Sequence, residues 1–304
     1  MISNNFVCLK GLFCRFLQKN VNCIRKNSTG KYCLELVRKH DFENYLCTLL
    51  LHKTIRRTGF AVRAFNIEVA TIQDQISDSK IGEMRFKFWE SSLIEILCKD
   101  KIPKHPVLIE LYIAAKTQKL SLPYLKRLIK SRENYMLNSS FKTTEDMDTY
   151  AENSVSPIYY LLLESLGIKD IKVDHAVSHL GKCQGIVNII RSIPYNTKSG
   201  HILIPQDILL KNKVSSENII RKSNEQNVRD AIFEMASRAN SHLTKAKKLE
   251  KDVDRQIKSI VLPSVPLQLY LNRLQKTNFN VFDEKLQERN NLLPLKLLWH
   301  KIVH

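Results

Sequence analysis

One stretch of the sequence, residues 181–207, carries polar side chains at spacings that could support chemistry on a helix. Ser192 and Asn196 are four residues apart, so they would share one helix face, and Arg191 lies beside them. Carboxylates at two such positions can hold Mg²⁺ against a diphosphate, whereas a hydroxyl and a carboxamide offer only neutral oxygens. We therefore expect no site for a hard cation at this pair.

A second stretch, residues 60–72, has a similar arrangement. Asn66 and Ala70 are again four residues apart, and Arg63 precedes Asn66 by about one turn. The nearest acid, Glu68, is two positions from Asn66, which turns it about 200° around a helix, so it faces away if Asn66 faces a site. Arg63 and Arg191 could hold an anion without a metal. They could equally pair with acids inside the protein, and the sequence favours neither interpretation.

The segments that carry these residues are predicted to be helices. Only 8 glycines and 9 prolines occur in 304 residues, and apolar residues recur at helical spacing along most of the chain. We see no repeat, no low-complexity block and no convincing strand. The pattern predicts one all-α domain of about ten helices. The expected ranges are 32–52, 54–72, 79–98, 107–118, 121 onward, 143–167, 173–191, 225–251 and a C-terminal pair after Pro263 that ends in 291–304.

Local signals add detail to these ranges. We expect the helix over 173–191 to break at Pro194, because proline lacks the amide hydrogen that a helix interior uses. Pro205 and Asp207 are typical of a helix start. In the helix over 79–98, the residues predicted to be buried are Met84, Phe88, Trp89, Leu93, Ile96 and Leu97.

The polar stretches resemble signatures of the squalene/phytoene synthase family. The second family signature, Gln-x-x-Asn-x-x-Arg-Asp-x-x-x-Asp with a basic turn and a Leu-Pro step, is matched, with a different Asn spacing, by Gln184, Asn188, Arg191, Gly200 and Pro205. Arg63-Ala64 matches the start of the Arg-Ala-Leu-Asp-x-x-x-Asp signature, and Asp146-x-x-x-Tyr150-Ala151 matches a central stretch. The four metal-binding acids of the family are replaced here by Asn66, Ala70, Ser192 and Asn196.

This resemblance implies a single helical domain with the type I isoprenoid synthase fold, in which two helices face each other across a cavity. Because the acids are missing, it implies a pseudoenzyme with no catalytic residue, cofactor or metal. The degenerate cavity positions are then Arg63, Asn66, Ala70, Arg191, Ser192 and Asn196. The alternative is an active prenyl-diphosphate transferase with relocated metal-binding acids, which would require two newly placed carboxylates in one cavity.

Residues 32–46, 62–70 and 150–170 most closely resemble mitochondrial members of the family that help to build respiratory complex I, the NADH:ubiquinone oxidoreductase. The resemblance implies a peripheral protein on the matrix side of the inner membrane. Its implied partners are complex I subunits or other assembly factors, with contact to anionic inner-membrane lipid as a further expectation.

The N-terminus has the composition of a mitochondrial transit peptide. Residues 1–34 contain no acid, and their basic residues are Lys10, Arg15, Lys19, Arg25, Lys26 and Lys31. We predict a transit peptide over 1–31 and the helical domain over 32–304. Without these six charges the formal net charge falls from +18 to +12, which suits an anionic membrane surface, nucleic acid or simple solubility. No aromatic–basic recognition motif accompanies the charge, so nucleic acid is not expected.

The remaining features are less specific. No apolar run approaches the roughly 18 residues that span a bilayer. The tail, residues 292–303, could lie on a membrane surface with Trp299 at the interface, but packing onto the core is the favoured interpretation. Seven cysteines without a Cys-x-x-Cys pair indicate reduced thiols. His175 and His179 have the spacing of a metal pair, but no acidic motif accompanies them and we expect structural roles.

Overall fold

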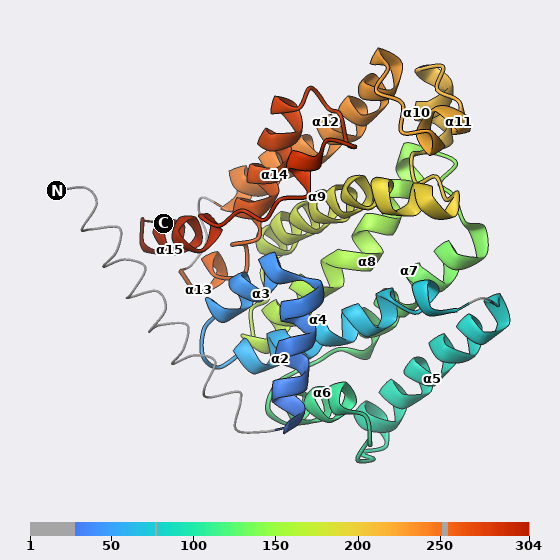
Figure 1. The fold of residues 1–304 in the computed structure, drawn as a ribbon. Helices are drawn as coiled ribbons and strands as arrows, with labels where there is room; N and C mark the ends of the chain where they lie inside the picture. The colour runs from blue at the N-terminus through green and yellow to red at the C-terminus, as the bar shows by residue number, and fades with distance from the viewer. Residues whose placement is uncertain (1–27, 77, 251–254, 304) are drawn as a thin grey trace.

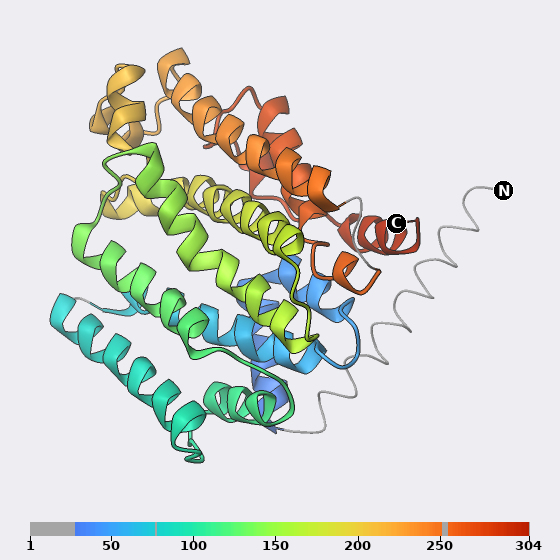
Figure 2. The same cartoon turned by 180° about the vertical axis from the view of Figure 1, so that it is seen from behind.

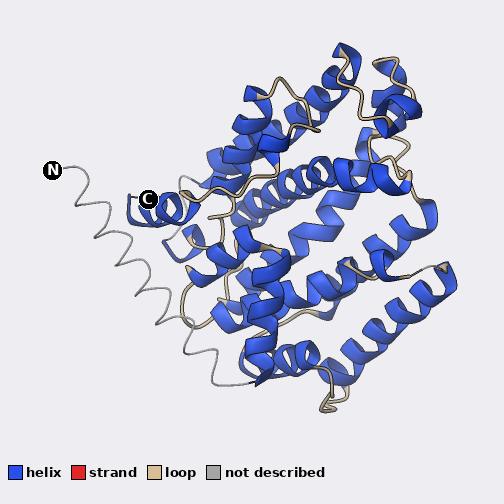
Figure 3. Ribbon diagram, viewed as in Figure 1, coloured by secondary structure: helices blue, strands red, loops and turns tan. Residues whose placement is uncertain are grey.

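The computed structural model describes residues 28–76, 78–250 and 255–303, and these residues form helices and connecting segments without a strand (Figures 1 and 3). The α-helices are α2 (Ser28–His40), α3 (Phe42–Leu49), α4 (Arg56–Ala70), α5 (Ser79–Cys98), α6 (Pro106–Thr117), α7 (Leu122–Asn138), α8 (Thr144–Ser165), α9 (Ile171–Asn196), α10 (Gln206–Lys211), α11 (Ser216–Ile220), α12 (Gln226–Glu250), α13 (Arg255–Lys258), α14 (Ser264–Lys276) and α15 (Leu293–Val303). Three short 3₁₀ helices are η1 (Gln73–Gln75), η2 (Thr197–Ser199) and η3 (Glu284–Leu286). The all-α prediction is confirmed.

The long helix α9 lies at the centre, between α8 and α12, while α4 packs against α2, α6, α7 and α8 (Figures 1 and 2). Two apolar clusters fill the interior. One gathers around α8, α9 and α12, and the other around α2, α4 and α5–α7. Helix α8 belongs to both clusters, because Tyr159 and Leu162 face the first while Ile158 and Leu161 face the second. The clusters are therefore joined into one helical unit.

Helices α8 and α9 approach each other closely at two glycines of α9. A Cβ added at Gly181 would lie 2.7 Å from the Cα of Ser156, and one added at Gly185 would lie 2.6 Å from the Cα of Ala151. Both glycines therefore allow the two backbones to approach closely, which fixes the position of the polar residues further along α9.

Two predicted helix ends differ from the structure. The range 32–52 is not one helix, because Asp41 interrupts it and caps α3 by accepting a hydrogen bond from the amide of Asn44. Helix α9 does not break at Pro194 but continues to Asn196. Pro194 lies in the last turn of α9, where side chains of Ser192 and Asn196 bond to the backbone carbonyls of Ile189 and Ser192. These side-chain bonds go to carbonyls of the same helix, and the proline removes one backbone hydrogen bond of the last turn without ending the helix.

The predicted buried face of α5 is partly wrong. Met84 and Phe88 are 71% and 51% exposed. The prediction is confirmed for Trp89, Leu93 and Ile96, which are buried. Phe86 is buried as well, three residues before Trp89 and seven before Leu93, so the buried face is turned away from Met84 and Phe88.

The structure also bears on the predicted transit-peptide boundary and on the prediction that no segment spans a bilayer. Helix α2 begins at Ser28, so the predicted division between residues 31 and 32 falls inside it. The rest of the predicted transit peptide lies outside the described residues. None of the helices in the described ranges combines the length and apolarity required to cross a membrane.

Candidate functional site

A cavity of about 280 Å³ lies between α4, α7, α8 and α9. Its apolar wall includes Val69, Phe86, Ile158 and Leu203, and a stacked group of Tyr135, Phe141 and Tyr150 forms one side. Tyr150 belongs to the Asp-x-x-x-Tyr stretch noted in the sequence. The cavity therefore combines an aromatic and aliphatic lining with a set of polar groups.

Four of the six predicted site residues line this cavity. Asn66 and Ala70 enter it from α4, and Ser192 and Asn196 enter it from α9. Helix periodicity places each pair on one face, and the α8–α9 contact brings the two helices to opposite sides of the cavity. Arg63 and Arg191 are not among the lining residues.

The polar groups on α9 are used mainly by the helix itself. The hydroxyl of Ser192 donates to the carbonyl of Ile189 at 2.8 Å, and Nδ2 of Asn196 donates to the carbonyl of Ser192 at 2.9 Å. The two side chains are thus hydrogen-bonded within their own helix. Neither carries the negative charge that a hard cation requires.

An arginine that the sequence analysis did not identify occupies the α4 side of the cavity. Nη2 of Arg132 donates to Oδ1 of Asn66 at 2.7 Å and to the carbonyl of Ser154 at 3.1 Å, and Nη1 donates to the carbonyl of Leu128 at 2.7 Å. Within the described residues Arg132 has no ion pair. Burial lowers the pKa of its guanidinium. The positively charged Arg132, held by neutral acceptors, therefore lies beside Asn66, which the resemblance assigns to the position of the first metal-binding acid.

Asp41 is the single carboxylate among the described residues that line the cavity. Its Oδ atoms accept from the side-chain amide of Asn44 at 2.9 and 3.0 Å, and burial raises the pKa of Asp41 while the charge of Arg63 lowers it. Glu68 does not line the cavity, because it accepts a hydrogen bond from the hydroxyl of Tyr32 on α2. One carboxylate facing one guanidinium does not fit the Mg²⁺ clusters that this fold implies.

Arg191 forms an ion pair with an acid inside the protein, which was one of the two interpretations left open by the sequence; the other was binding of an anion. Its Nη1 lies 2.7 Å and its Nη2 3.2 Å from the carboxylate oxygens of Glu43, and its guanidinium lies 4.3 Å from the ring centroid of Tyr270. These contacts occur in a separate polar pocket between α3, α9 and α14. Arg191 therefore ties these three helices together and does not point into the central cavity.

Arg63 is 3% exposed and lies beneath the cavity, 6.0 Å from the ring centroid of Tyr159. Its Nε has no hydrogen-bond partner among the described residues. The hydroxyl of Tyr159 donates to Oε1 of Gln184, and burial raises the pKa of this phenol while Arg63 opposes the shift. Arg63 is thus a buried cation next to the cavity without a direct ion pair in the described part of the chain.

His179 contacts a histidine on another helix rather than His175, with which it shares the spacing of a metal pair. Nδ1 of His179 lies 2.9 Å from Nδ1 of His242, and Nε2 of His242 lies 3.4 Å from Oδ2 of Asp148, which also accepts from Arg238. His175 does not join this group. The described residues contain no cluster of three or more His, Cys, Asp or Glu that could hold a metal.

Comparison with known proteins agrees with this geometry. Residues 37–294 match the squalene/phytoene synthase family. A Bos taurus protein named NADH dehydrogenase (ubiquinone) complex I, assembly factor 6, is 41% identical over 278 residues, which cover 90% of this chain and 83% of the relative. Its Drosophila melanogaster homolog is 40% identical over 294 residues, covering 94% and 88%.

Among solved structures, a dehydrosqualene synthase in complex with ligand superimposes with a TM-score of 0.79 at 16% identity, covering 94% of this chain and 96% of that chain. At this identity the likeness supports the fold alone. Together with the match over residues 37–294, the helical architecture and the two facing helices identify the chain as a member of the squalene/phytoene synthase family.

Proposed function

We propose that this protein is an assembly factor for mitochondrial respiratory complex I and that it acts by binding rather than by catalysis. The observation that carries the proposal is the 41% identity, over 90% of the chain, to a cattle protein named as such a factor. Its partners are then complex I subunits or other assembly factors, which its helical scaffold would engage directly.

The central cavity supports a non-catalytic role. Metal-dependent prenyl transfer requires several carboxylates that hold Mg²⁺ against a diphosphate, and the described lining offers Asp41 alone. The guanidinium of Arg132 further disfavours a divalent cation beside Asn66, since like charges repel. An active transferase with relocated acids would require a second carboxylate in the same lining.

The proposed location is the matrix side of the mitochondrial inner membrane, with peripheral attachment. The naming of the relatives supports the mitochondrial location. The formal charge of +12 that remains without the predicted transit peptide favours contact with a surface of anionic lipid.

Two experiments test the proposal. Cells that lack the protein should lose complex I on native gels while other respiratory complexes persist, and the wild-type chain should restore it. Unchanged complex I would contradict the assembly role. Separately, the purified protein should release no diphosphate from prenyl diphosphates with Mg²⁺ or Mn²⁺. Turnover that disappears in an Asp41→Asn variant would contradict the non-catalytic role.

A further inference from the structure

A groove of about 1120 Å³ lies between α14, η3 and the start of α15. Five basic residues line it: Arg273, Lys276, Lys285, Arg289 and Lys296. Only two acids, Asp283 and Glu288, accompany them. The groove lining thus has an excess of three positive charges and is open to an anionic ligand.

Among the described residues, no carboxylate forms an ion pair with these five cations. Nη1 of Arg273 donates to the backbone carbonyl of Glu288 at 2.9 Å, and the guanidinium of Arg289 lies 5.1 Å from the ring centroid of Phe42. Of the two acids, Asp283 is used to cap η3 through the amide of Lys285. The groove therefore keeps most of its charge available for a partner.

Helix α15 borders this groove and presents apolar side chains outward. Leu293 and Leu297 are buried, and Nζ of Lys301 donates to the carbonyl of Leu50, so the inner side is fixed to the core. On the outer side Trp299 and Ile302 are each 70% exposed and lie three residues apart on one face. The prediction that the tail packs on the core is confirmed for the inner side only.

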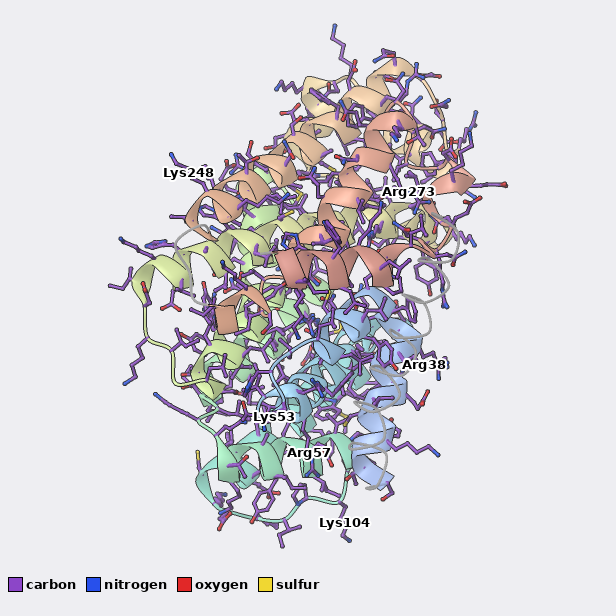
Figure 4. All side chains as sticks on the ribbon, turned by 90° about the vertical axis from the view of Figure 1, so that its left-hand side faces the viewer. Arg38, Lys53, Arg57, Lys104, Lys248 and Arg273 are labelled. Atoms are coloured by element: carbon purple, nitrogen blue, oxygen red, sulfur yellow. The ribbon has the colours of Figure 1, made fainter. Side chains whose placement is uncertain are left out.

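Figure 4 views the side of the molecule on which α15 lies in Figure 1, and basic residues are spread over this face. Lys53, Lys104 and Lys248 are exposed, and none has an ion pair in the described residues. Arg38 and Arg57 on the same face do have acidic partners, Glu35 and Glu110. The face thus combines an exposed tryptophan, an exposed isoleucine and an excess of cations.

We propose that this face docks on a bilayer of anionic phospholipid. Trp299 and Ile302 would enter the boundary between headgroups and acyl chains, while the groove cations would contact lipid phosphates. This inference deepens the peripheral location given under the proposed function and rests on it. A lipid surface is favoured over an acidic protein segment because such a segment would use the groove charge but would not account for the apolar outer side of α15.

Trp299 provides a local reporter for the test. The chain has two tryptophans, and Trp89 is buried at 5% exposure, so a full-length Trp89→Phe variant leaves Trp299 as the only indole. Its fluorescence should shift to the blue and become protected from aqueous quenchers with phosphatidylcholine vesicles that contain cardiolipin, but not with phosphatidylcholine alone. Every variant contains the basic segment 1–27. A difference in vesicle binding between variants therefore reports on the substituted face and not on that segment.

Matched substitutions separate the contributions. Binding to vesicles is measured by sedimentation for two double variants. One carries Trp299→Ser and Ile302→Ser, and the other carries Lys276→Glu and Lys285→Glu. Each should bind on the order of thirty-fold more weakly, or worse, than the wild type. The controls are Met84→Ser with Phe88→Ser, an exposed apolar pair on α5, and Lys198→Glu with Lys222→Glu, exposed lysines near α11. Both controls should bind like the wild type.

Absence of the Trp299 shift, or equal loss in test and control variants, would overturn the proposal. The proposal would also be overturned if the Lys276→Glu, Lys285→Glu variant kept its vesicle binding but lost crosslinks to a mitochondrial protein. That result would indicate a protein interface. Because the vesicle assay uses purified protein, its failure is distinct from a failure to restore complex I in cells.

Discussion

The guanidinium of Arg132 lies 2.7 Å from Oδ1 of Asn66 and so places a positive charge beside the position that the resemblance assigns to the first metal-binding acid. The neutral side chains at the four positions implied by the resemblance are therefore only part of the proposed change. A cation also fills the space beside them, and its other hydrogen bonds go to the carbonyls of Leu128 and Ser154. Both changes act against Mg²⁺ binding.

This relationship predicts how a metal site could be restored. A variant with Asp at positions 66, 70, 192 and 196 should gain little Mg²⁺ affinity, because the new carboxylate at 66 would pair with Arg132. Adding Arg132→Met should allow Mg²⁺ to bind, as measured by calorimetry. Arg132→Met alone is the control and should bind no Mg²⁺. Equal affinity of the fourfold variant with and without Arg132 would show that the guanidinium does not matter.

A second prediction concerns the ion pair of Arg191 and Glu43. Both side chains are about one-third exposed, the pair is bidentate, and Arg191 also contacts the ring of Tyr270. A double-mutant cycle with Arg191→Met and Glu43→Gln should give a coupling of about 1 kcal/mol in urea unfolding.

The exposed pair of Arg221 and Glu217 on α11 is the matched control. Its coupling should not exceed about 0.5 kcal/mol, since solvent screens exposed pairs. Similar values for the two pairs would contradict a special role for Arg191 in joining α3, α9 and α14.

Much of the fold follows from local sequence. The helix over 79–98 was predicted with the bounds of α5, and α8 begins within the range predicted over 143–167, where Thr143 and Asp146 form a capping box. Gly167, with φ of 72°, ends that region because glycine tolerates this conformation. These signals depend on residues within a few positions of one another, so a single sequence contains them.

The features that were missed depend on distant residues. Arg132 sits in an ordinary polar stretch, and only its contacts with Asn66 and Ser154, 66 and 22 positions away, reveal its place in the cavity. His179 was paired with His175 by spacing, whereas the fold brings it to His242 on α12. The four degenerate positions were placed by resemblance to family signatures, and local physics alone would not have brought α4 and α9 to one cavity.

A third prediction tests the α8–α9 contact. Alanine normally stabilises a helix relative to glycine by about 0.5–1 kcal/mol. At Gly185 the sign should reverse, because the added Cβ would lie 2.5 Å from the Cβ and 2.6 Å from the Cα of Ala151. Gly185→Ala should lower the free energy of unfolding by about 2 kcal/mol. Adding Ala151→Gly should recover part of this loss, and a failure to do so would place the strain elsewhere.

A fourth prediction concerns pH. Burial and then the neighbouring His242 lower the pKa of His179 from 6.5 to about 4, with Lys182, Lys245 and His175 acting in the same direction. The unfolded chain therefore takes up a proton at His179 between pH 6.5 and about 4 while the folded chain does not, so stability falls as pH decreases through this window.

His179→Asn should reduce the slope of stability against pH in that window, measured by urea unfolding at several pH values. His201→Asn, an exposed histidine that does not act on His179, is the control and should keep the wild-type slope. An unchanged slope in His179→Asn would assign the acid sensitivity to other groups.

The last prediction concerns the start of the folded domain. Oγ1 of Thr29 donates to Oε1 of Glu110 at 2.6 Å, and the same buried carboxylate binds Arg57 through Nε at 2.6 Å and Nη2 at 2.9 Å. Removing residues 1–27 should keep this network, whereas removing residues 1–31 deletes Thr29 and should cost about 1 kcal/mol of stability. Thr29→Val in the longer chain should reproduce most of that loss. Both truncated chains should remain in the cytosol of expressing cells, because the basic, acid-free segment is absent from each. Import of either chain at the full-length level would refute the transit-peptide prediction, and equal stability of the two chains would mean that the Thr29–Glu110 contact contributes nothing to the fold.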